Sequence, residues 1–174
     1  NLNMKILRLN FNKLHSLEKN LFNNLTQLVN LFLSHNKLKK IEDNLFIDQK
    51  NLFELDLSFN HLEELGNRSL YGLESLTRLK IENNYLKRIE RFSFIHLKNL
   101  EILDNFGYQK IVKIESEAFL GLGNLIGLVL KFNLLTKFEN FTFSGLKNLL
   151  RLYINNNQIR YLEPEIFDEL KNLI

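Results

Sequence analysis

Few residues of this sequence have side chains and spacings suited to catalysis or metal binding. Asp56, Ser58 and His61 are the residue types of a hydrolytic triad, and His35 with His61 and Asp56 could ligate a metal ion. The triad lacks an elbow turn or a glycine-supported oxyanion hole, and no motif fixes a third metal ligand. The chain also has no cysteine, which excludes thiol nucleophiles and thiolate zinc sites within it. We therefore predict no catalytic site, no metal site, no cofactor and no enzymatic activity.

Three asparagines lie in Asn-X-Ser/Thr sequons, which are acceptor sites for N-linked glycans: Asn24, Asn67 and Asn140. The chain is so rich in asparagine that chance alone would produce nearly as many. Their placement is more informative, because all three fall away from the strand segments identified below. We predict them as glycosylation sites that would leave a binding surface on the strands unobstructed.

Composition limits the class of partner. The 174 residues are 45% hydrophobic and 25% charged, with a net charge of +3 and both signs mixed along the chain. A mixed surface of this kind offers no large single-sign field for a polyanion, so we predict no nucleic-acid partner. The longest apolar stretch, near Leu125 to Leu130, is interrupted by Gly127 and is far shorter than the ~18 residues of a membrane span. We expect no membrane contact by this segment.

A repeat of 24 residues organises the whole chain. Asparagines recur in steps of 24, with one doubled step of 49, at Asn12, Asn36, Asn60, Asn84, Asn133 and Asn157. Apolar residues occupy positions 1, 4, 6, 11, 14, 19 and 22 of each unit, and only Gln49 breaks this pattern when one gap is allowed in the fifth unit. We predict a single array over residues 1–174, with units at 4–27, 28–51, 52–75, 76–99, 100–124, 125–148 and 149–172 and the start of another at 173.

Each unit contains the pattern of a short strand followed by a turn. In the second unit Leu31 and Leu33 alternate with Asn30, Phe32 and Ser34, as expected for a strand with one buried face. The asparagine at position 9 follows the strand, where its amide can satisfy the turn backbones of neighbouring units. Position 19 is Leu70 in the third unit and phenylalanine in the other six. The phenylalanines predict a stacked aromatic spine: Phe22, Phe46, Phe94, Phe119, Phe143 and Phe167.

The consensus L-x-x-L-x-L-x-x-N-x-L-x-x-L-x-x-x-x-F-x-x-L-x-x closely resembles the "typical" class of leucine-rich repeats over residues 4–172. The resemblance implies an α/β-type repeat solenoid, a curved horseshoe with a concave parallel β-sheet and a mostly irregular convex side. This class is characteristic of extracellular proteins such as Toll-like receptors, Slit proteins, lamprey variable lymphocyte receptors and small matrix proteoglycans. It implies an extracellular or cell-surface ectodomain and a role such as innate immunity.

Two departures from a complete member of that class stand out. Position 15 often carries proline, whereas here it carries glutamate in six units and Gly66 in the third. We expect the cations at position 13 to offset this glutamate column: Lys40, Arg88, Lys113 and Lys137. Family members also carry disulfide-bonded caps at both ends of the array, and such caps are missing here, so we expect an internal fragment of a longer ectodomain.

The concave face is the predicted binding surface, because the fold does not need the side chains at positions 3, 5, 7, 8 and 10. Strands ~4.8 Å apart give seven units a face on the order of 30 Å across, which suits a protein ligand. The fifth unit has one extra residue near Asp104, which predicts a local bulge. The candidate ligand-binding residues are Arg8, Phe11, Phe32, His35, Glu54, Asp56, Phe59, Arg78, Lys80, Tyr85, Asp104, Asn105, Tyr108, Lys131, Phe132, Arg151 and Tyr153.

Alternatives remain open at this point. Phe11, Phe59, Tyr108 and Phe132 at position 8 are equally explained as an aromatic row that packs along the sheet, and the bulge as a neutral insertion. For the whole chain we predict a protein-recognition module of a receptor or secreted protein, compatible with a homodimer or a receptor complex. The alternatives are a structural, matrix-organising repeat protein and a regulatory repeat segment of a larger enzyme.

Overall fold

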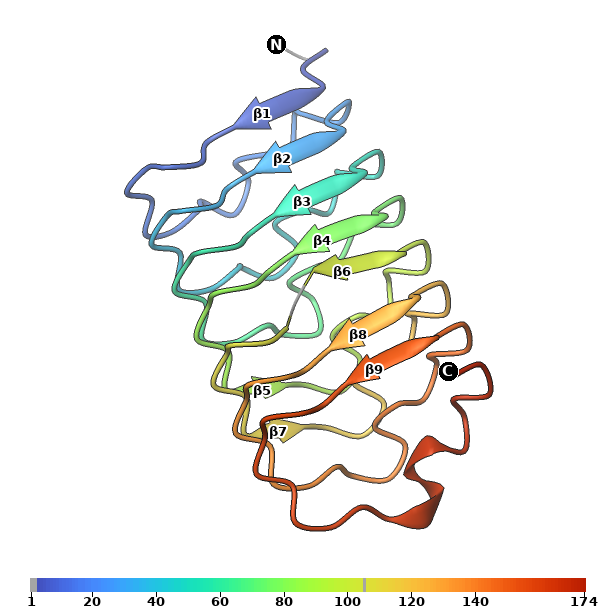
Figure 1. Cartoon of the computed structure of the whole chain (residues 1–174). Helices are drawn as coiled ribbons and strands as arrows, with labels where there is room; N and C mark the ends of the chain where they lie inside the picture. The colour runs from blue at the N-terminus through green and yellow to red at the C-terminus, as the bar shows by residue number, and fades with distance from the viewer. Residues whose placement is uncertain (1–2, 105) are drawn as a thin grey trace.

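The computed structural model describes residues 3–104 and 106–174. The chain winds into a solenoid whose strands lie side by side along one face, with irregular loops on the other (Figure 1). The elements are β1 (Ile6–Arg8), β2 (Asn30–Phe32), β3 (Glu54–Asp56), β4 (Arg78–Lys80), β5 (Arg88–Ile89), β6 (Ile102–Asp104), β7 (Lys113–Ile114), β8 (Gly127–Val129), β9 (Arg151–Tyr153) and the 3-10 helix η1 (Pro164–Phe167).

The strand face is parallel and keeps the 24-residue period of the sequence. β1, β2, β3, β4 and β6 form one sheet in that order, β8 and β9 form a second, and β5 and β7 pair beside the turns. Leu31 pairs with Leu55, and Leu55 with Leu79, so equivalent residues of successive units lie next to one another. These central leucines are fully buried while their strand neighbours face outward, which confirms the predicted alternation.

One continuous core runs through the solenoid behind the strands. The predicted aromatic spine is present on the far side of this core: Phe94 and Phe119 stack with ring centroids 6.0 Å apart, and Phe119 and Phe143 stack at 6.4 Å. Burial of each such large apolar side chain contributes roughly 1.5–3 kcal/mol. Because the rings of neighbouring units cover one another, except where Leu70 lies between Phe46 and Phe94, this contribution depends on stacking between units.

The asparagine at position 9, which recurs in six of the seven units, joins neighbouring turns. Asn60 donates through Nδ2 to the carbonyls of Leu33, one unit back, and Leu57, at 3.0 and 3.2 Å. Its Oδ1 accepts the backbone N–H of Leu38 at 3.0 Å. The predicted asparagine ladder is confirmed, since Asn36, Asn84 and Asn133 make the same contacts in their own units.

Two glutamines show how the pattern tolerates exceptions. Gln109 takes the ladder position after the insertion, and its longer side chain accepts from Leu86 N at 3.4 Å and donates to Ile81 O at 3.0 Å. Gln49, the polar residue in an apolar column, is fully buried and donates to the carbonyl of Phe22 at 2.7 Å. Both replacements keep a buried backbone carbonyl satisfied.

The outer side is irregular, as predicted. In the described part of the chain the only helical element is η1, so the "α" part of the expected fold class is reduced to a single short turn. No helix among the described residues is long and apolar enough to cross a bilayer.

We predict that Asn60→Ala lowers the free energy of unfolding by about 2–4 kcal/mol, because it leaves buried backbone groups of two units without partners. The measurement is urea denaturation followed by circular dichroism. Asn155→Ala is the matched control: this residue is exposed and its replacement should change stability by less than about 0.5 kcal/mol. Equal losses for the two variants would contradict the ladder's structural role.

Candidate ligand-binding surface on the concave face

The strand register brings the predicted binding residues into rows on one face. The outward residues at position 5 run across the sheet as Arg8, Phe32, Asp56, Lys80 and Asp104, each paired in register with the next. Val129 and Tyr153 occupy the same position on β8 and β9. We call the surface formed by these rows and by the turns directly after the strands the concave face. Its geometry follows from the fold, whereas its binding of a ligand is still a prediction.

Several charges at the centre of this face are already paired. Lys80 Nζ lies 3.1 Å from Glu54 Oε1, and Asn30 Nδ2 donates to Glu54 Oε2 at 3.3 Å. Asp56 Oδ1 accepts the N–H and the hydroxyl of Ser58 at 3.0 and 2.6 Å. These contacts fix the side chains in place, so the centre presents a pre-organised polar surface and not a set of free charges.

Three other predicted cations have no ion-pair partner within the described ranges: Arg78, Lys131 and Arg151. Arg8 lies with its guanidinium carbon 5.0 Å from the centroid of the Phe32 ring, a cation–π distance. Tyr85 lies at the edge of the face beneath Lys110, whose Nζ is 5.0 Å from the tyrosine centroid. Arg and Tyr side chains placed in this way are the residue types that dominate protein interfaces.

The aromatic residues at position 8 stack along the sheet in two groups. Phe11, His35 and Phe59 form one, with successive centroids 4.3 Å apart and nearly parallel rings. Tyr108 and Phe132 form the other at 4.6 Å. The aromatic residues at position 8 therefore do pack along the sheet, but Phe11 is 72% and Tyr108 54% exposed. Only His35 has both ring faces covered, whereas each of the other four rings is stacked on one face.

Sequence reasoning missed the backbone conformation beneath this row. Position 8 adopts a positive φ, a left-handed conformation that costs L-residues other than asparagine and glycine roughly 1 kcal/mol or more. The available signal was asparagine at this position in two units. The N–H of each aromatic residue donates to the next unit, as from Phe59 to Glu82 O at 2.9 Å. At position 8, positive φ values occur at Phe11, His35, Phe59, Asn83, Tyr108, Phe132 and Asn156.

The insertion in the fifth unit interrupts the sheet. The five-stranded sheet ends at β6, and β8 and β9 pair separately. Phe106 is fully buried and packs edge-on against Phe94 at 5.8 Å, so the insertion displaces the strand without emptying the core. Backbone hydrogen bonding to the next unit resumes at Tyr108, whose N–H donates to Lys131 O at 3.2 Å. Asp104 lies at the break, and the predicted site residue Asn105 lies outside the described residues.

The candidate catalytic and metal residues do not form a site. The Ser58 hydroxyl donates directly to Asp56, without an intervening imidazole. The ring of His35 is held between two phenylalanines, and that of His61 lies 5.5 Å from the ring of Tyr85. Within residues 3–104 and 106–174 no group of three or more histidine, cysteine or acidic side chains could hold a metal ion.

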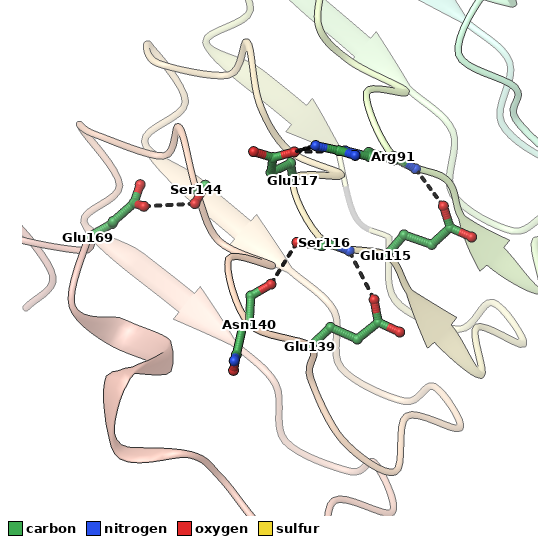
Figure 2. A network of polar contacts seen from close by, with 8 residues as sticks. All are labelled: Arg91, Glu115, Ser116, Glu117, Glu139, Asn140, Ser144 and Glu169. Atoms are coloured by element: carbon green, nitrogen blue, oxygen red, sulfur yellow. Dashed lines mark hydrogen bonds and ion pairs between the residues drawn. The ribbon is translucent and has the colours of Figure 1, made fainter.

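Two members of the glutamate column on the outer side, Glu115 and Glu139, cap backbone groups of the preceding unit (Figure 2). Glu115 Oε2 accepts the N–H of Arg91 at 3.0 Å, and Glu139 Oε2 accepts that of Ser116 at 3.2 Å. Lys113 Nζ lies 3.2 Å from Glu139 and 3.9 Å from Glu115. The expected charge compensation is confirmed for Lys40, Arg88 and Lys113, whereas Lys137 makes no ion pair with a described residue.

The three sequon asparagines are exposed and lie on loops away from the strands. Ser116 Oγ donates to the backbone carbonyl of Asn140 at 2.8 Å, and Figure 2 shows the Asn140 amide pointing away from the polar network. The sequon hydroxyls of Ser69 and Thr142 are buried and donate to backbone carbonyls at 3.1 and 2.6 Å, unlike the exposed Thr26. Glycan occupancy is still a prediction.

Two clusters on the outer loops have shifted pKa values. Burial lowers the pKa of His96, whose ring packs edge-on against Tyr71 at 4.8 Å, and so favours the neutral form of this histidine. A hydrogen bond from Lys87 and its positive charge lower the pKa of the exposed Glu63. Both groups lie outside the predicted binding residues.

We predict that His35→Ala lowers the free energy of unfolding by about 1 kcal/mol, because it removes both ring contacts in the three-membered stack. Thermal and urea unfolding would measure the loss. His15→Ala is the control, since His15 is exposed and makes no ring contact with a described residue. If the two variants were equally stable, the stack would not contribute to the fold.

Comparison with known proteins agrees with this geometry. A model of the leucine rich repeat matches residues 3–62, 50–104 and 128–173. Among solved structures, one entitled "Crystal structure of TLR13-ssRNA13 complex" superposes with a TM-score of 0.91 at 34% sequence identity. That similarity covers 99% of this chain and 24% of the other, so this chain spans about a quarter of that protein's length. No match was found among curated proteins.

The family model covers most of the chain, and the periodic core, the asparagine ladder and the parallel strand face are the structural counterparts of its consensus. The expected likeness to a Toll-like receptor ectodomain is confirmed by the superposition. This chain belongs to the leucine-rich-repeat family.

Proposed function

We propose that the chain is part of a protein-recognition module that binds its ligand on the concave face. The observation that supports this most directly is the difference between the inward and the outward side chains of the strands. Inward strand residues are buried in the core, whereas outward ones carry exposed aromatic groups and cations such as Arg78 and Arg151, which make no ion pair with a described residue. A rigid sheet bearing such anchors presents binding groups at little entropic cost.

A second candidate ligand is single-stranded nucleic acid. The similar structure is a complex with ssRNA13, which removes the ground for excluding nucleic acid from the overall charge. Net charge averages over all faces, whereas binding depends on local cations, and β1 and β2 with their turns present Arg8, Lys13 and Lys37 beside aromatic rings. We favour a protein ligand because Glu54, Asp56 and Asp104 on the same strands would repel phosphates.

We predict that the variant Phe32→Ala, Arg78→Ala, Tyr153→Ala loses at least about tenfold in partner affinity, because it removes three exposed anchors of the face. The measurement is quantitative mass spectrometry of cell-surface and secreted proteins retained on the immobilised chain. The control variant, Phe141→Ala, Arg68→Ala, Tyr161→Ala, removes the same residue types from the outer side and the flank and should retain the same partners. Retention unchanged by the concave variant would contradict the proposal, and retention of RNA alone would favour the second candidate.

We further propose an extracellular or lumenal location, supported by the likeness to a Toll-like receptor ectodomain. We predict that protein secreted from a eukaryotic host carries glycans at Asn24, Asn67 and Asn140, because each asparagine is exposed on a loop. Peptide mass spectrometry after deamidating deglycosylation would measure the occupancy of each. Three unmodified asparagines in secreted protein would count against this location.

A further inference from the structure

The outward side chains of β8 are smaller than those of the neighbouring strands on the concave face. Gly127 and Val129 are the outward residues of this strand, and they lie in register beside Arg151 and Tyr153 of β9. On the other side, β6 carries Ile102 and Asp104 at the same unit positions. A hydrogen atom and an isopropyl group therefore lie between rows of longer side chains. We call these residues the β8 strip: Ile102, Asp104, Gly127, Val129, Arg151 and Tyr153.

The floor of the strip is open. A Cβ atom built on Gly127 would meet nothing closer than the carbonyl oxygen of Arg151 at 4.0 Å, and its backbone conformation suits any residue. Glycine is therefore not required here by the fold. The apolar walls are accessible as well, since Ile102 is 38% and Tyr153 45% exposed. Exposed apolar groups around an unfilled floor suit the insertion of an apolar side chain from a partner.

The charges around the strip favour an acidic partner. Lys131 and Arg151 lie on adjacent strand units, four positions apart, and neither makes an ion pair with a described residue. Asp104 is the one acidic side chain among the outward residues of β6, β8 and β9. At about 3.3 Å per residue, four positions along an extended chain span ~13 Å. An extended segment with carboxylates four residues apart would match the two cations, with an apolar residue midway.

Nucleic acid fits this strip less well. Tyr153 is the one aromatic ring of the strip, and the next rings, Tyr108 and Phe132, are stacked on each other at 4.6 Å, so successive bases would not find a series of free ring faces. Asp104 would repel a phosphate at the β6 edge, whereas Ile102 and Val129 offer aliphatic contacts that a base does not need.

We propose that the β8 strip binds an extended segment of a partner protein in which an apolar side chain lies between two carboxylates. The inference rests on the proposed function and narrows it to three strands and one class of peptide. The apolar side chain packs over Val129 beside Tyr153, next to the open space above Gly127, and the carboxylates contact Lys131 and Arg151.

The test uses fluorescein-labelled peptides and fluorescence anisotropy with the purified chain. A Glu-Ser-Leu-Ser-Glu peptide should bind at least about tenfold more tightly than Lys-Ser-Leu-Ser-Lys or Glu-Ser-Ser-Ser-Glu, because only the first supplies both charge and apolar contact. Gly127→Leu fills the floor and should weaken this binding by about tenfold or more. Gly123→Leu, in the loop before β8, is the matched control, since its Cβ would likewise make only an ordinary van der Waals contact, 3.8 Å from Gly145 O.

A second variant tests the charges independently of the glycine. The double variant Lys131→Glu, Arg151→Glu should bind the lysine peptide more tightly than the glutamate peptide. If Gly127→Leu is less stable than its control in thermal unfolding, the peptide preference of this double variant is the test of the inference. Equal binding of the three peptides, no binding, or an unchanged preference in the charge-reversed variant would overturn the inference. Binding of a 13-nucleotide single-stranded RNA that Gly127→Leu abolishes would overturn it in favour of nucleic acid.

The outcomes separate this inference from the proposed function. If partner binding is lost on substitution of Phe32 and Arg78 but survives Gly127→Leu, the concave face binds the ligand elsewhere and only the strip assignment fails. If none of these substitutions affects binding of the partner, both the strip and the concave-face function fail.

Discussion

A single repeat cannot bury its own apolar side chains, and the rest of the structure follows from that constraint. Leucines at the strand centre and phenylalanines on the far side become fully buried only when the next unit covers them. Equivalent residues must then lie in register, and the asparagine amides that bridge neighbouring turns keep this register. The stability of the solenoid is thus a property of interfaces between units and not of any unit alone.

The same constraint leaves the outward strand residues free for recognition. Because their side chains do not support the core, Arg78, Tyr153 and Gly127 can differ from unit to unit without disturbing the packing behind them. Side chains on the outer side are more constrained, because Glu115 and Glu139 each cap a backbone group of the preceding unit. Variation in side-chain size and charge is therefore best tolerated on the strand face.

Much of the fold could be predicted because burial imposes a strict pattern on sequence. The strands, the aromatic spine and the ladder follow from apolar and asparagine spacing alone. Contacts among exposed side chains impose no such pattern, so the pairing of Lys80 with Glu54 and the missing partner of Lys137 were not predictable. The positive φ beneath the aromatic row was hidden because Phe59 and its equivalents are unusual residues for that conformation. The exclusion of a nucleic-acid partner did not hold as an argument, because an overall charge carries no information about one face and a similar structure is a complex with ssRNA13.

The most direct test of this account is a saturation mutagenesis scan in which the folding stability of every single substitution is measured by protease resistance. The account predicts sensitivity that recurs every 24 residues, with the inward positions and the ladder asparagines intolerant and the outward strand positions tolerant. A scan without that period, or one in which outward residues such as Arg78 and Tyr153 are as sensitive as Leu79 and Leu55, would contradict it.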